Sequence, residues 1–290
     1  MKNNKLKIIA FILVLIVLIL LIILFVIKVT NYSIKDSEYN NVNDNKAYIE
    51  HRDKNHKTVD KLKTVQAKDD NIEQINTYLK NVHFNGSITV LKDGKLMLDK
   101  GYGYQNISSK KKSNANTMYL IGSAQKFTTG LILKHLELSN KININDPVTK
   151  YLPWFKTNKT ITLKDLMLHR SGLYKFSANP NTKSLDGAVH DIQRRGINSK
   201  YYHKHLYNDA NYLVLAQVIE AVTHHSYVEN YYKFLAEPYH LEHSAFFNEK
   251  PYKKNMATGY KVKNEKLKTM KPNTLDQYYG AGTVSYTHLT

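Results

Sequence analysis

The sequence predicts an α+β fold in which a helix and two antiparallel strands come first and a block of helices follows. The first observation is a run of apolar residues at helical spacing between Asn71 and His83. The second is an Asp93-Gly94 turn between two runs of strand-forming residues. The third is a series of apolar helical patterns between 118 and 235. We therefore expect a helical domain beside an antiparallel sheet that draws further strands from elsewhere, because a lone hairpin is not stable in water.

The composition indicates a polyanionic neighbour. The 290 residues include 42 Lys+Arg against 24 Asp+Glu, which gives a net charge of +18. Nucleic acid, an anionic membrane surface and an acidic cell-wall polymer all match such an excess. Cysteine is absent, which excludes disulfides and thiolate metal sites.

The N-terminal segment predicts the location. An uninterrupted apolar run, Ile8 to Ile27, follows Lys2, Lys5 and Lys7. It is long enough to cross a bilayer as a helix, and no small-residue cleavage site follows it. We predict a cytoplasmic tail at 1–7, one retained transmembrane anchor at 8–28, and everything beyond it outside the cell. This single-pass placement in the cell membrane disfavours nucleic acid as the partner and favours a wall polymer or a lipid surface.

The remaining chain divides into a polar extracellular linker at 29–70 and a domain at 71–290. Within the domain, we predict a short helix in 161–173 capped by Thr162, an uncertain helix around Ala188, a helix from Ala210 with Asp209 as its N-cap, and a further helix at 228–235.

The stretch from Met118 to Glu137 carries the candidate nucleophile. Ser123 and Lys126 stand three residues apart at the start of a predicted helix, so a hydroxyl and an amine share one face. A serine beside a base is the arrangement for covalent catalysis, although a small polar residue at a helix start also serves as a cap. Because the following residues are apolar nearly all round, including Phe127 and Leu131, we expect this helix to be buried on most sides.

Two further Ser-x-x-Lys matches, at Ser108 and Ser109, lie in a polar lysine run without an apolar continuation, and we interpret them as a solvated loop.

Tyr207-Asn208-Asp209 precedes another buried helix. A tyrosine there can relay a proton for a serine, and the polar side chain two residues on can position substrate or the lysine. The alternative is structural, with Asp209 as a helix cap and Tyr207 as a packed aromatic.

The 13 histidines do not form a recognisable metal motif, since none has HExxH spacing and no cysteine supports them. The chain also lacks a G-x-S-x-G elbow and a phosphate-binding GxxxxGK[ST] loop. We predict no cofactor and no metal.

The ordered combination of motifs is more specific than any one of them. It resembles the penicillin-recognising serine hydrolases, in the branch of class C β-lactamases, D,D-peptidases and esterases. The match extends from about Asn71 to Gly282 and rests on Ser123-Ala-Gln-Lys126, NDPVTKYLPWF, LKDLMLHRSGL, Tyr207-Asn208-Asp209 and Gly280-Ala281-Gly282.

Within that branch the phrases GYGYQN, LIGSAQKF and KININDPVTKYLPWFK are similar to the staphylococcal FmtA-type teichoic acid D-alanyl esterases, which are membrane-attached and associated with methicillin resistance. Most of the branch has Asn where this chain has Asp209.

The resemblance implies a β-lactamase/transpeptidase-like fold and a serine hydrolase that removes D-alanyl esters from teichoic acids. It implies Ser123 as nucleophile, Lys126 as general base and Asp209 as a third catalytic residue, with Tyr207 assisting. Asn208, Gly280 and Gly282 are then expected to bind substrate.

Two points stay open in the sequence. The family's last strands follow the Gly-Ala-Gly segment, whereas here only TVSYTHLT follows, so we expect the sheet to lack its C-terminal strands, which leaves the activity of the fragment open. The shared nucleophile chemistry does not separate the ester substrate from the amide of a D,D-peptidase or β-lactamase. A non-catalytic wall-binding module is the third alternative.

Overall fold

The computed structural model describes residues 62–177, 182, 184–246, 249–264, 266–270 and 285–287, all within the unit that extends from Asp44 to Thr290. The predicted tail and anchor and most of the predicted linker lie outside the described residues. Among the helices in these ranges, none has the length and apolar character needed to cross a membrane.

The predicted first helix and hairpin are confirmed. Helix α3, Asp70–Asn81, begins at Asp69, whose carboxylate accepts hydrogen bonds from two backbone N–H groups of the first turn. Strands β2, Gly86–Lys92, and β3, Lys95–Tyr102, pair antiparallel. Both residues of the connecting turn, Asp93 and Gly94, have positive φ, as a tight hairpin turn requires.

A short strand lies before residue 70, within the range predicted as linker. Strand β1, Val65–Gln66, pairs antiparallel with Asp99 and Leu98 of β3, which gives a three-stranded sheet of order β1-β3-β2. Residues from Val65 onward therefore belong to the fold, because their backbone groups are taken up by the sheet.

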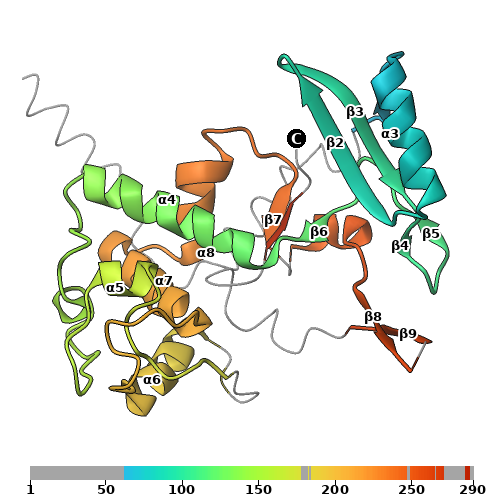
Figure 1. Ribbon diagram of the computed structural model, residues 1–290. Helices are drawn as coiled ribbons and strands as arrows, with labels where there is room; N and C mark the ends of the chain where they lie inside the picture. Colours follow the sequence, from blue (N-terminus) through green and yellow to red (C-terminus); the bar gives the residue numbers. More distant parts are fainter. Residues whose placement is uncertain are drawn as a thin grey trace, which may run out of the picture. The chain divides into compact units, whose positions relative to one another are not determined.

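The helical part is built around α7, Asp209–Thr223, which contacts four other helices (Figure 1). These are α4, Gln125–Leu138, α5, Leu163–Met167, α6, Leu185–Arg195, and α8, Tyr227–Tyr231, which continues as a π-helical turn, Tyr232–Ala236. Six residues of α7 are completely buried: Ala210, Val214, Leu215, Ala216, Val218 and Ile219. Helix α7 is thus the centre of the main hydrophobic core.

Two expectations for the helices are wrong. Helix α4 is not buried on most sides, since only one apolar stripe faces the core while Phe127 and Leu131 are 71% and 40% exposed. The N-cap of α7 is Asn208 and not Asp209, which is the first residue of the helix. The cap of α5 by Thr162 is confirmed, and Asp165 completes a capping box.

The remaining described strands are short. β6, Tyr119–Leu120, β10, Ser285–Thr287, and β7, Ser244–Phe246, form a second sheet in that order, so one strand lies within the last eight residues. β4, Tyr104–Asn106, pairs with β5, Lys111–Lys112, and β8, Tyr260–Lys263, pairs with β9, Lys266–Thr269. The architecture is α+β, as predicted.

We expect a pH-dependent stability from Glu220, near the end of α7. Its Oε1 accepts a hydrogen bond of 2.8 Å from the Tyr227 backbone N–H, and burial raises the pKa of this carboxyl from 4.5 to about 7. The folded state therefore prefers the protonated acid. Its stabilising contribution is complete below about pH 4.5 and is lost as the pH rises through about 7. Glu220→Gln keeps the acceptor and removes the charge, so above pH 7 it should be more stable than the parent by up to about 3 kcal/mol.

The measurement is denaturant unfolding between pH 4.5 and 8, with the exposed Glu242→Gln as control. Parallel pH curves for Glu220→Gln and the parent protein would show that this carboxyl is already ionised without penalty in the folded state.

Candidate active site

Ser123 lies on a sharp connection between strand β6 and helix α4. A single 3₁₀ turn, Gly122–Ala124, carries it, and its side chain is exposed. Gly122 has φ of +53°, a left-handed conformation that costs a residue with a side chain roughly 1–2 kcal/mol. The glycine thus lets the chain change direction directly before the candidate nucleophile.

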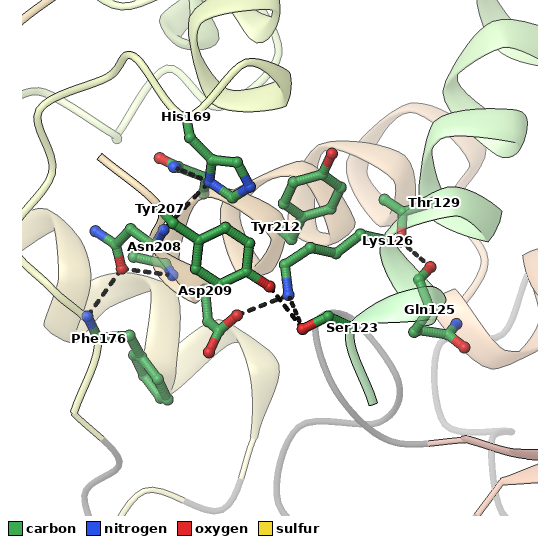
Figure 2. Close-up of polar contacts among 12 residues, drawn as sticks. Ser123, Gln125, Lys126, Thr129, His169, Phe176, Tyr207, Asn208, Asp209 and Tyr212 are labelled. Carbon is green, nitrogen blue, oxygen red and sulfur yellow. Dashed lines mark hydrogen bonds and ion pairs between the residues drawn. The ribbon is translucent and has the colours of Figure 1, made fainter. Parts of the chain in front are cut away.

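Lys126 and Tyr207 contact Ser123, and Asp209 contacts Lys126 (Figure 2). Ser123 Oγ is 2.6 Å from Tyr207 Oη, and Lys126 Nζ donates to Ser123 Oγ at 3.3 Å. Lys126 Nζ also forms an ion pair of 2.7 Å with Asp209 Oδ1. The Ser-x-x-Lys motif and the Tyr-Asn-Asp motif, more than 80 residues apart in sequence, therefore form one hydrogen-bonded group.

The amine of Lys126 is enclosed on several sides. The residue is 7% exposed, and its Nζ lies 5.1 Å and 5.5 Å from the ring centroids of Tyr207 and Tyr212. Ring faces attract a cation at such distances, and so does the carboxylate of Asp209. These contacts hold the amine beside the serine hydroxyl.

Tyr227, a buried residue of α8, forms hydrogen bonds with the first turns of α4. Tyr227 Oη accepts a hydrogen bond of 3.0 Å from Gln125 Nε2 and lies 2.6 Å from Thr129 Oγ1. Burial raises the pKa of the Tyr227 hydroxyl, so this phenol stays neutral. No pattern in the sequence indicates a role for Gln125, yet its bond to Tyr227 positions the helix turn that carries Lys126.

Asn208, for which the sequence analysis predicts contact with substrate, has a buried side chain. Its side chain is 2% exposed and all its hydrogen-bonding capacity is used internally. Oδ1 accepts from the backbone N–H groups of Ala210 and Phe176, at 3.1 and 2.9 Å, and Nδ2 donates to the carbonyls of Leu173 and Tyr174, at 2.8 and 3.1 Å. These bonds position its neighbours in the sequence, Tyr207 and Asp209, and contact between Asn208 and substrate stays a prediction.

His169 supports the same turn, and the sequence analysis did not single it out. Its Nδ1 accepts hydrogen bonds from Asn208 N, at 3.2 Å, and Asn211 Nδ2, at 2.9 Å, and its ring centroid lies 4.5 Å from that of Tyr207. Burial, followed by the charges of Lys126 and His205, lowers the pKa of His169. The imidazole is thus neutral and available as an acceptor. The only signal in the sequence is its place in LMLHRSGL, directly before Arg170-Ser171-Gly172.

Two predicted residues lie outside the described residues. These are Gly280 and Gly282, so their expected contact with substrate stays a prediction. Within the described ranges, no three His, Asp or Glu side chains are grouped so as to hold a metal ion.

A serine exposed on the turn that leads into a helix, with an amine and a phenol within hydrogen-bonding reach of its oxygen, is the arrangement of a serine hydrolase. Comparison with known families agrees with this class. Residues 70–288 match the Beta-lactamase family model, and the chain belongs to this family.

Its relatives narrow the class further. The chain is 50% identical to a Staphylococcus aureus protein named teichoic acid D-alanine hydrolase, over 99% of this chain and 73% of the relative. The structure superposes on the crystal structure of FmtA from Staphylococcus aureus with a TM-score of 0.80 and 54% identity, covering 84% of this chain and 69% of that one. An octameric penicillin-binding protein homologue from Pyrococcus abyssi, 24% identical with a TM-score of 0.62, shares the fold.

If Asn208 is structural, Asn208→Ala should lower the free energy of unfolding by about 2–4 kcal/mol, because four backbone groups lose their partner, those of Ala210 and Leu173 on buried residues. Asn145→Ala is the matched control, since Asn145 is exposed and its side-chain amide bonds only to the side chain of Asn143. Denaturant unfolding measures both. A stable Asn208→Ala variant with a raised KM alone would instead indicate direct substrate binding.

Proposed function

We propose that this protein hydrolyses D-alanyl esters on teichoic acids through an acyl-enzyme on Ser123. The observation that carries the proposal is the contact of Ser123 Oγ with both Lys126 Nζ and Tyr207 Oη. The half-identical relative named for the same activity supports the substrate, and the net charge of +18 suits a polymer of repeating phosphates.

The reaction has two stages. Ser123 Oγ attacks the carbonyl carbon of the D-alanyl ester, its proton passes to a base, and the polyol oxygen leaves with a proton as a hydroxyl. The product is D-alanine esterified to Ser123. Water then attacks this second ester, which frees D-alanine and restores the serine.

Lys126 and Tyr207 are the two groups that can take the proton from Ser123. Lys126, in its unprotonated form, acts as the general base, the role that the family resemblance implies, and Tyr207 Oη, at 2.6 Å, relays the proton between the serine and the leaving oxygen. Asp209 acts on Lys126 by holding its amine toward Ser123 with the 2.7 Å ion pair.

We also propose that the enzyme works at the outer face of the cell membrane. The apolar run at 8–27, with three lysines before it, supports a single-pass anchor. D-alanylated teichoic acids lie on that side of the membrane, so anchor and substrate agree.

Ser123→Ala should abolish D-alanine release and the formation of a covalent adduct, because no other hydroxyl occupies its place between Lys126 and Tyr207 in the described structure. The assay incubates the chain with D-alanylated teichoic acid, quantifies free D-alanine, and records the intact mass after treatment with a serine-acylating reagent. Circular dichroism checks folding.

The same assay separates ester from amide. D-alanyl-D-alanine peptide cleaved at a higher kcat/KM than the teichoic acid ester would overturn the substrate assignment and leave a D,D-peptidase. Ester hydrolysis retained by a folded Ser123→Ala would overturn the nucleophile.

Tyr207→Phe removes one oxygen and keeps the ring contacts with His169 and Lys126. We expect kcat to fall by about 10²-fold with KM little changed, the effect of losing a proton-transfer group. Steady-state kinetics on a soluble D-alanyl ester measures it. A kcat that stays within about twofold of the parent would assign proton transfer to Lys126 alone.

A further inference from the structure

The β8–β9 hairpin places like charges directly opposite one another. Lys261 pairs with Lys268 across the two strands, and Lys263 pairs with Lys266. Residues two apart on a strand point to the same side, so all four ammonium groups share one face, with about 7 Å between successive lysines along each strand. Opposed like charges destabilise a hairpin, which indicates that this face serves a purpose other than stability.

These four lysines are exposed and make no ion pair with any carboxylate in the described part of the chain. Between Tyr260 and Thr269 the sequence has one acidic residue, Glu265, against four lysines. Some lysines of the helical part are paired instead, since Lys134 and Lys150 form ion pairs with Glu137 and Asp146 at 2.9 and 2.7 Å.

A second basic hairpin adjoins the first (Figure 1). The β4–β5 hairpin contributes the exposed Lys110, Lys111 and Lys112; Lys111 Nζ donates to the carbonyl of Lys254, and Lys112 Nζ lies 4.0 Å from the ring centroid of Tyr104. Hydrogen bonds join the two hairpins: Thr258 N to Gln105 O at 2.9 Å, Asn106 Nδ2 to Thr258 Oγ1 at 3.0 Å, and Ile107 N to Tyr260 Oη at 2.9 Å. The β4–β5 hairpin thus supports the β8–β9 hairpin from the side of Tyr260, and the lysines on the other face of β8–β9 form the lysine surface (Lys261, Lys263, Lys266 and Lys268).

This surface is attached to the strand that leads to the nucleophile. Met118 N donates to Asn255 O and Ala257 N donates to Met118 O, both at 2.8 Å. Met118 precedes Ser123 by five residues, and Ala257 precedes the hairpin's first residue, Tyr260, by three. A ligand bound to the lysine surface is therefore attached, through residues 255–257, to the strand residues that lead to Ser123.

We propose that the lysine surface binds the phosphodiester backbone of a linear polyol-phosphate polymer, and so holds the substrate chain while its D-alanyl esters reach Ser123. The proposal rests on the function proposed above and names the part of the protein that grips the polymer. Phosphates repeated along a chain match ammonium groups repeated along two strands, and they relieve the repulsion between the paired lysines.

An anionic lipid surface would present the same phosphate chemistry, but the hairpin fits it less well. Its apolar side chains, Val262 and Leu267, are 72% and 57% exposed and lie on the face opposite the lysines. An element that lies in a membrane interface buries its apolar face in the lipid, and in this hairpin that orientation would direct the four lysines away from the bilayer. Here the two kinds of contact point in opposite directions.

The test compares two variants of the chain with equal charge change. One carries Lys261→Gln, Lys263→Gln, Lys266→Gln and Lys268→Gln. The control carries Lys156→Gln, Lys159→Gln, Lys200→Gln and Lys204→Gln, which are exposed lysines of the helical part. The probe is teichoic acid stripped of D-alanine, and binding is titrated at low and high salt. All eight positions are on the surface, and circular dichroism confirms folding.

The hairpin variant should bind the stripped polymer about tenfold more weakly, with a smaller dependence on salt, and its KM on D-alanylated polymer should rise by a similar factor. Its kcat on a small soluble D-alanyl ester should stay that of the parent. The control variant should change binding by less than about twofold.

Equal weakening by both variants would overturn the proposal, because net charge alone would then explain binding. A hairpin variant that binds the polymer as the parent does would also overturn the proposal. If that variant loses binding to phosphatidylglycerol vesicles but not to phosphatidylcholine vesicles, the surface binds lipid instead. Binding to stripped polymer does not require catalysis. A parent protein that cleaves no ester would therefore refute the proposed function while the binding comparison still decides the lysine surface.

Discussion

The ion pair between Lys126 and Asp209 joins the first turns of the two central helices, α4 and α7. A helix N-terminus carries partial positive charge, which favours Asp209 at the start of α7 and opposes Lys126 at the start of α4. A largely buried ammonium in that position depends on a carboxylate partner, and Asp209 supplies it at 2.7 Å. The position of Lys126 beside Ser123 therefore depends on the packing of α7 against α4, because that packing brings Asp209 to Lys126.

Neutral polar side chains hold the turn before α7 in place. Asn208 satisfies four backbone groups, His169 accepts from Asn208 and Asn211, and Ser171 Oγ donates to Asn211 Oδ1 at 2.5 Å. Buried polar groups are stabilising only when all of them are paired. This network therefore gives Tyr207 a fixed position while leaving its hydroxyl, on a side chain that is 47% exposed, open to a reactant.

Charge is distributed unevenly over the described chain. Lys134 and Lys150 of the helical part pair with carboxylates, whereas the lysines of the β4–β5 and β8–β9 hairpins form no ion pair within the described residues. A surface of one sign raises the local concentration of a polyanion and guides it along its length. The chemistry at Ser123 and the lysine surface would then act on different parts of one substrate, the ester and the phosphodiester backbone.

The sequence by itself determined the α+β class, the α3 helix, the Asp93-Gly94 hairpin and the candidate nucleophile, because these depend on local spacing: apolar periodicity, a turn dipeptide, and two side chains three residues apart. The motif resemblance added Tyr207 and Asp209, which the structure brings to Ser123 and Lys126. Only the tertiary structure decided that Asn208 caps α7 and is buried, that His169 and Gln125 support the site, that Phe127 and Leu131 face outward, and that β1 extends the sheet. Each of these features depends on which segment, distant in sequence, packs against the residue, and the residue's neighbours in sequence do not indicate that segment.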